Sequence, residues 1–291
     1  CYCPLFTLMA LPSQAMGDAC GYMAILCWGT PFVFGYNAVC AILKGRGDSR
    51  RPLRFVAAAA VVNLLLDLIL AGPCGLGTAG TAWATVAAQG VSFLLSLAHL
   101  HRCVPLSLRR LPLRPAALLS LLRLGLPSAV QMAVVNLSYL ILTGLLNPFG
   151  VSVAAAAGIG LKVSTFAGMP CWALGYGVTA MVGQNLGAGD PDRVRQTVRS
   201  GLLLSLGATA LLTALVQLAA APIIALFEPE NAAVTAEGVR YLRICCSVNG
   251  LIYAAMYVFD SFAIGSGASW VAMCNAMLDA ALLRLPLCWL L

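Results

Sequence analysis

The chain has 291 residues, of which 61% are hydrophobic and only 9% charged, and its formal net charge is +7. An average soluble domain carries roughly 25% charged residues, so this composition excludes an ordinary water-soluble protein. The positive charge does not indicate a nucleic-acid partner, because 13 of the 17 Lys and Arg lie in three short stretches between apolar runs, at 44–54, 102–123 and 193–199.

The apolar runs reach the roughly 18 to 25 residues that a helix needs to cross about 30 Å of hydrocarbon. They are too long and too uniform for barrel strands, and lipid leaves no other way to satisfy the backbone, so the sequence predicts an all-α membrane protein. After an apolar stub at 1–11 we expect eight spans, at about 19–43, 55–72, 78–100, 124–146, 151–182, 200–227, 240–264 and 269–291. The apolar start and the apolar end together predict a fragment truncated at both ends.

The three basic stretches follow the first, third and fifth predicted spans, so all three fall on one face of the membrane. Cytoplasmic loops of membrane proteins retain Lys and Arg, which predicts that this face is the cytoplasmic face of a cell membrane. The loops on the opposite face fit this assignment, because 72–78 and 147–150 carry no charge and 227–237 carries three Glu.

Two short motifs recur in the same order about 220 residues apart. They are Tyr-x-x-Ile-x-Cys, at 22–27 and 241–246, and Gly-x-Gly-x-Ser, at 45–49 and 265–269. The copies begin six spans apart, so two halves would share one orientation, as in transporters built from parallel repeats. Chance similarity between apolar helices is the alternative.

The repeat predicts a bundle of two pseudo-symmetric six-helix lobes. Residues 1–100 would be the end of the amino lobe, with part of helix three and helices four to six. Residues 101–123 would be the basic cytoplasmic linker, and residues 124–291 the carboxy lobe, with helices seven to eleven. The chain would then lack its first two helices and its last.

Asp67 is the strongest functional candidate, because an ionisable group inside a bilayer is costly and is retained for a purpose. It lies some 12 residues into its predicted span, and Asn63 lies one helical turn before it on the same face. Thr85 lies at a comparable depth in the next span. Carboxylate, amide and hydroxyl oxygens suit a small hard cation, and a desolvated carboxyl group can also hold a proton. The alternative is a structural role, in which Asp67 only joins two helices through hydrogen bonds.

Four polar residues of the later spans are candidates for the lining of a substrate cavity: Lys162, Asp279, Gln131 and Asn136. Lys162 can instead snorkel or pair with a carboxylate, and the two amides can simply join helices. Asn275 and Asp279 repeat the spacing of Asn63 and Asp67 but lie out of register with them, so no second equivalent site is expected. Asp260 lies nearer a helix end and is expected at the membrane interface.

Two loops carry distinctive motifs: Gly183-Gln-Asn-Leu-Gly-Ala-Gly-Asp-Pro-Asp-Arg-Val-Arg195 and Ala41-Ile-Leu-Lys-Gly-Arg-Gly-Asp-Ser-Arg50. The first resembles the loop after the eighth helix of the multidrug and toxic compound extrusion (MATE) transporters, and the second resembles the loop after their fourth helix. The resemblance implies a twelve-helix, two-lobed antiporter that exports cationic or amphipathic compounds, including drugs and other xenobiotics, against Na⁺ or H⁺.

The resemblance also assigns the coupling-ion site. Asn63, Asp67 and Thr85 match the fifth- and sixth-helix positions of an amino-lobe site, and Tyr22 matches a fourth-helix tyrosine. The other acidic residue of that site belongs to the first helix, so the fragment by itself is expected to be inactive. The carboxy-lobe acidic site of some members is not matched, because 124–146 contains no Asp or Glu.

Three other functions compete with coupled export. A flippase for lipid-linked precursors or a polysaccharide exporter of the same superfamily would need a cavity lined with several Arg, and only Lys162 is available. An intramembrane enzyme is disfavoured because no catalytic motif is present. A purely structural subunit would have little use for Asp67. The twelve cysteines include no C-x-x-C pair, which argues against a disulfide or zinc framework. We expect no cofactor or metal beyond the coupling ion. We also expect a monomer in the bilayer with a small-molecule substrate.

Overall fold

The computed structural model describes residues 13–103, 114–146, 151–227 and 232–284, and the regular elements in these ranges are all helices. The chain divides into two compact units, Cys1–Leu111 and Pro112–Leu291, which are described separately below. The division falls within the basic stretch 101–123. The all-helical class predicted from the apolar runs is confirmed.

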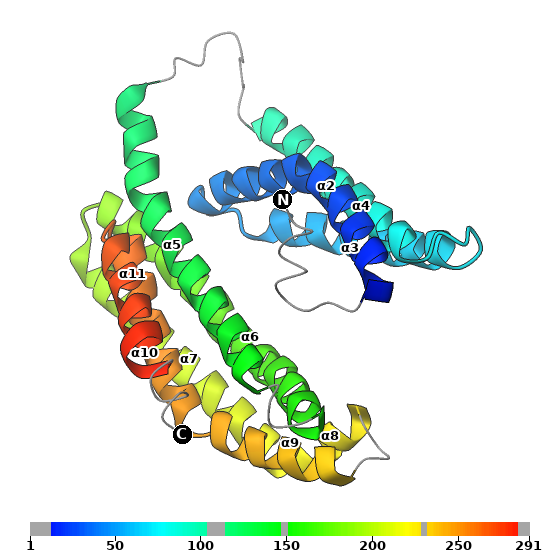
Figure 1. Ribbon diagram of the computed structural model, residues 1–291. Coiled ribbons are helices and arrows are strands. Elements are labelled where there is room, and N and C mark those ends of the chain that lie inside the picture. The colour runs from blue at the N-terminus through cyan, green and yellow to red at the C-terminus, as the bar shows by residue number, and fades with distance from the viewer. Residues whose placement is uncertain (1–12, 104–113, 147–150, 228–231, 285–291) are drawn as a thin grey trace. The chain divides into compact units, whose positions relative to one another are not determined.

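The first unit contains three long helices: α2 (Ser13–Gly45), α3 (Arg50–Ala71) and α4 (Gly77–Cys103). α4 packs along both of its neighbours, whereas α2 and α3 barely touch each other, so α4 is the centre of this unit (Figure 1). Small residues permit this position, because Ala82, Ala84 and Ala88 are buried on α4. Gly29 of α2 allows the same close approach, since a Cβ atom there would lie 2.7 Å from Val86 Cγ2.

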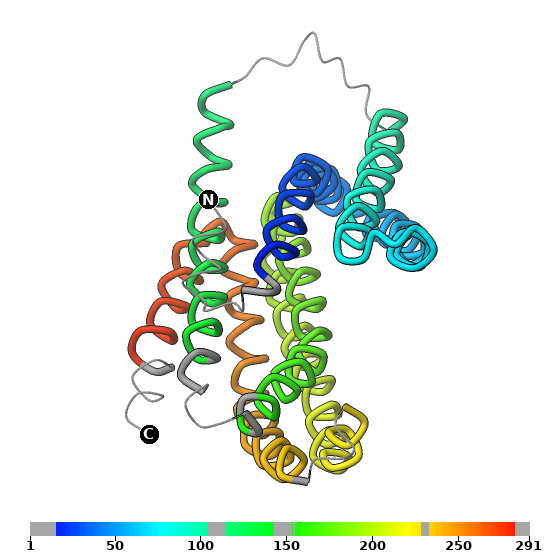
Figure 2. The backbone as a smooth tube through the Cα atoms, turned by 45° about the vertical axis from the view of Figure 1, so that its right-hand side comes forward, coloured from blue at the N-terminus to red at the C-terminus, as the bar shows by residue number. Residues whose placement is uncertain are grey.

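The second unit is built around one long helix, α6 (Val151–Gly187), against which three other helices pack. These are α7 (Pro191–Leu218), α9 (Ala232–Cys245) and α10 (Val248–Gly265), and the short helix α8 (Ala220–Phe227) joins α7 to α9. On the other side, α5 (Pro115–Leu146) runs alongside α11 (Ser269–Leu278), which continues as the π-helical segment η3 (Asp279–Arg284) (Figure 2). Val178, Val182, Val194 and Val258 form a buried cluster where α6, α7 and α10 meet.

Each of the eight predicted spans coincides with helical structure, but two of them are divided in two. The span at 200–227 breaks at Ala219 between α7 and α8, and the span at 240–264 breaks near Ser247 between α9 and α10. Several helices also extend beyond the apolar run, because lipid sets the length of the run whereas a turn residue sets where the helix stops. The end of the last predicted span, 285–291, lies outside the described residues.

Six of the described helices are long and apolar enough to cross a membrane: Met16–Gly45, Arg50–Ala71, Gly77–Cys103, Pro115–Leu142, Pro191–Leu218 and Val248–Gly265. Large apolar side chains are exposed along them, for example Trp28 at 79%, Phe34 at 75% and Leu211 at 63%. Apolar exposure on this scale would cause a soluble protein to aggregate, and it is the normal surface of a protein dissolved in lipid. The chain is therefore a multi-pass membrane protein.

The turn that ends α2 recurs at the end of α10. In both turns the chain forms a Schellman motif, with a glycine at positive φ, 87° at Gly47 and 88° at Gly267. The paired hydrogen bonds have matching partners: Gly47 N to Lys44 O and Asp48 N to Leu43 O in the first turn, and Gly267 N to Ile264 O and Ala268 N to Ala263 O in the second. Each pair of equivalent atoms is 220 residues apart, so the recurring sequence motif encodes the same backbone twice.

Gly265→Ala is expected to destabilise the second unit. A Cβ atom at this position would lie 2.6 Å from the carbonyl oxygen of Thr179 and 3.0 Å from Val182 Cβ, so α10 and α6 would have to move apart. We expect a loss of about 1–3 kcal/mol. Gly177→Ala is the matched control on α6, because nothing lies within 4 Å of its added Cβ atom. Thermal unfolding in detergent measures both variants, and equal melting temperatures would contradict this account.

Candidate functional site

Asn63 and Asp67 lie one turn apart on the same side of α3. Both side chains are half-buried, whereas Leu64 and Leu68, next to them in sequence, are 61% and 65% exposed. Since α3 packs almost entirely on α4, the half-buried side of α3 is the side that contacts α4. The pair therefore faces the interior of the first unit and not the lipid.

Neither side chain is fully satisfied by the protein. Asn63 Nδ2 and Asp67 Oδ1 are buried atoms without a hydrogen-bond partner among the residues that the structure describes. An unpaired buried polar atom costs roughly 1–3 kcal/mol, and more if the group is charged. Rotation of the Asn63 amide by 180° would place its carbonyl oxygen where Nδ2 lies. The two side chains can then offer oxygens to a small cation, or Asp67 can take up a proton.

Thr85 and Tyr22 are not joined to this pair by hydrogen bonds. Thr85 is half-buried on α4, and its hydroxyl donates to the carbonyl oxygen of Thr81 at 2.9 Å. Tyr22 is half-buried on α2, and the described residues provide no hydrogen-bond partner for its hydroxyl. The structure therefore places Asn63 and Asp67 together, and the roles of Thr85 and Tyr22 stay predictions that depend on the resemblance.

Three of the candidates for a substrate cavity in the second unit differ in exposure and in hydrogen bonding. Lys162 is exposed on α6 and has no ion-pair partner in the described ranges. Asn136 is exposed on α5, where its amide donates to Met132 O of its own helix at 2.8 Å. Asp279 is half-buried at the start of η3. A common cavity for these three residues stays a prediction.

Gln131 belongs to a polar cluster that the sequence did not reveal. Its Nε2 donates to Asp260 Oδ2 at 3.4 Å, and Asn275 Nδ2 donates to Asp260 Oδ1 at 3.0 Å, so three helices, α5, α10 and α11, meet at one carboxylate. Asp260 is thus half-buried and held by side chains of two neighbouring helices within the second unit. Sequence spacing could not find this cluster, because Gln131 and Asp260 are separated by 129 positions.

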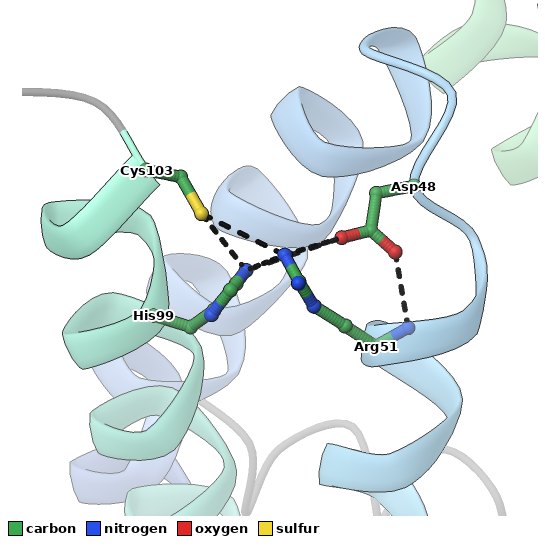
Figure 3. Close-up of polar contacts among 4 residues, drawn as sticks. All are labelled: Asp48, Arg51, His99 and Cys103. Carbon is green, nitrogen blue, oxygen red and sulfur yellow. Dashed lines mark hydrogen bonds and ion pairs between the residues drawn. The ribbon is translucent and has the colours of Figure 1, made fainter.

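A second polar cluster joins the start of α3 to the end of α4 (Figure 3). Arg51 Nη1 lies 3.2 Å from Asp48 Oδ2 and 2.6 Å from His99 Nε2, and Cys103 Sγ lies 3.1 Å from the same His99 nitrogen. The imidazole nitrogen that accepts from the guanidinium carries no proton. His99 therefore contacts Arg51 of α3 and Cys103 of its own helix.

The family model described as MatE matches residues 3–69 and 127–290 of this chain. The chain is 32% identical over 237 residues to the probable multidrug resistance protein YoeA of Bacillus subtilis, covering 78% of this chain and 51% of that protein. It is 34% identical over 192 residues to the probable multidrug resistance protein YpnP of the same organism, covering 65% of this chain and 43% of that protein. The chain thus spans about half the length of the curated relatives it matches.

Solved structures of MATE transporters share the fold of this chain. A structure described as the outward-facing conformation of a multidrug resistance MATE family transporter of the MOP superfamily matches with a TM-score of 0.91 at 18% identity, over 99% of this chain and 66% of that one. A mutant of the Vibrio cholerae MATE transporter VcmN matches with a TM-score of 0.88 at 25% identity, over 99% and 65% of the two chains. With its family model matched over most of its length and its fold shared with these transporters, the chain belongs to the MatE family of membrane transporters.

Proposed function

We propose that this chain is part of a cation-coupled exporter of small amphipathic or cationic compounds, with Asp67 and Asn63 in the site that binds the coupling ion. The observation that carries the proposal is the pair of unsatisfied buried atoms, Asp67 Oδ1 and Asn63 Nδ2. A structural Asp in a membrane helix would be expected to have its oxygens occupied by donors, as Asp260 does. An ion or proton that comes and goes gives Asp67 its missing partner for part of each cycle.

The site at Asp67 can exchange its bound ion or proton because few protein groups hold the Asp67 and Asn63 side chains. Asp67 and Asn63 come from a single helix, and Thr85, on the helix that packs against it, keeps its hydroxyl bonded to Thr81. A movement of α4 relative to α3 would therefore change access to Asp67 without breaking a hydrogen bond at the site. Occupancy at Asp67 then biases the packing of α3 on α4, which is the kind of differential interaction that coupling requires.

The descriptions of the relatives support drugs as the substrate class. YpnP and YoeA of Bacillus subtilis and PmpM of Pseudomonas aeruginosa are all described as multidrug resistance proteins. A relative described as the FAD transporter of Shewanella oneidensis, 28% identical over 210 residues, shows that the family also includes a different cargo. The chemistry at Asp67 is independent of the cargo, because it concerns the driving ion.

Asp67→Asn in the full-length protein is expected to abolish ion-driven efflux. The amide keeps the shape of the carboxylate but can neither take up a proton nor provide the negative charge that holds Na⁺. Release of a cationic dye from liposomes under a Na⁺ gradient or a pH gradient measures coupling, at matched expression. Asp192→Asn, an exposed Asp at the start of α7, is the control for removal of one carboxylate. Near-normal efflux by the Asp67 variant would refute the assignment.

The same proposal predicts opposite stability effects for two intramembrane carboxylates. Asp67→Asn removes an unsatisfied charge and should leave the melting temperature unchanged or raise it. Asp260→Asn places an amide donor against the donor of either Gln131 or Asn275, and should cost about 1–2 kcal/mol. Thermal unfolding in detergent compares the two variants. A larger loss for Asp67→Asn than for Asp260→Asn would mean that Asp67 is structural.

A further inference from the structure

The loop between α2 and α3 forms one wall of a basic hollow. The hollow has a volume of about 490 Å³ and is lined by residues 46–51 and Arg54. Four of its seven lining residues are arginines: Arg46, Arg50, Arg51 and Arg54. Nothing in the proposed transport cycle uses them.

Most of this positive charge has no counterion in the protein. Asp48 is the carboxylate of the hollow, and it is already engaged by Arg51, through the side chain at 3.2 Å and the backbone N–H at 3.3 Å. Arg46, Arg50 and Arg54 are exposed, and none of them lies within 4.0 Å of a carboxylate oxygen in the part of the chain that the structure describes. Three guanidinium groups therefore face a hollow without a partner.

The backbone around the hollow is held in place before anything binds. The Schellman turn at Gly47 fixes the loop, with the Asp48 N–H donating to Leu43 O at 2.9 Å. Arg51 is fixed from the other side by His99 of α4, as Figure 3 shows. A preorganised backbone loses less entropy on binding, so the site favours a ligand more than a flexible basic loop would.

The surroundings indicate which anion fits. α2 and α3 are both candidate membrane spans, so the loop that joins them lies at the membrane surface. Along α3, Leu53 lies between the arginines and is 70% exposed, Val56 follows them and is 46% exposed, and the exposed apolar side continues to Leu64 at 61%. An anion held by the arginines would therefore have an apolar helix face beside it, which suits a molecule with a phosphate group and acyl chains.

We propose that this hollow binds the headgroup phosphate of an anionic phospholipid. Guanidinium groups bind phosphate oxygens through paired, charge-assisted hydrogen bonds, and basic groups at a membrane surface are attracted to anionic lipid. The acyl chains lie along Leu53 and Val56. This inference does not rest on the coupling site, since the hollow and its arginines are separate from Asp67 and lipid binding is measured without transport.

The test compares two variants that remove the same charge from matching places. Arg50→Gln/Arg54→Gln changes two exposed arginines one turn apart at the start of α3, and Arg195→Gln/Arg199→Gln changes two exposed arginines one turn apart at the start of α7. Native mass spectrometry of the full-length protein in detergent gives apparent dissociation constants for phosphatidylglycerol and for phosphatidylcholine with the same acyl chains. Inorganic phosphate at millimolar concentration is added as a competitor in a separate arm.

We expect tighter binding of phosphatidylglycerol than of phosphatidylcholine by the unchanged protein. The α3 variant should bind phosphatidylglycerol about tenfold more weakly, and the α7 variant should bind it as before. Equal losses of phosphatidylglycerol affinity in both variants, or no loss in either, would overturn the proposal. Displacement of the lipid by inorganic phosphate would also overturn it, because the hollow would then be a site for free phosphate. If the α3 variant is not recovered folded, Arg46→Gln, outside the helix, tests the same hollow with the same readings.

Discussion

Hydrocarbon offers no hydrogen bonds, and this one property of the bilayer explains most of what the chain does. Because of it, the backbone must form its hydrogen bonds within helices. A polar side chain in a span is also unfavourable in free energy unless it has a hydrogen-bond partner, and otherwise it is expected to have a function. Asp260 meets the first condition, with an amide donor from α5 on one oxygen and an amide donor from α11 on the other. Asp67 does not, because one of its oxygens is buried and unmatched. The two carboxylates are thus distinguished by their hydrogen bonds, since both oxygens of Asp260 accept one whereas Oδ1 of Asp67 accepts none.

The sequence predicted the features that depend on local pattern. Hydropathy located the helices, because the length of an apolar run is set by the thickness of the hydrocarbon. Asp190 and Pro191 are residue types typical of a helix start, and α7 begins there, with the Asp190 carboxylate accepting from the Arg193 N–H at 3.0 Å. The spacing of Asn63 and Asp67 predicted that both would share one face of their helix, and both side chains are half-buried on that face.

Features that depend on long-range packing could not be read from the sequence. The helix breaks at Ala219 and near Ser247 lie inside apolar runs, so hydropathy did not register them. The Asp260 cluster unites residues from three helices, and the pattern at Asn275 pointed instead to Asp279, four residues along its own helix. The contact between His99 and Arg51 also depends on packing, because it forms only where the start of α3 lies against the end of α4.

The central position of α4 has a consequence for the biosynthesis of the first unit. α2 and α3 are joined by a short turn, yet they share almost no surface, and each is held by α4 instead. A ribosome delivers α2 and α3 to the membrane before α4 has been made. Until then the two helices have little to associate with inside this unit, and Asn63 and Asp67 have no covering helix. The packing of α2 and α3 in this unit therefore waits for α4, and a nascent chain stopped before Gly77 would lack the helix on which the Asn63 and Asp67 side of α3 packs.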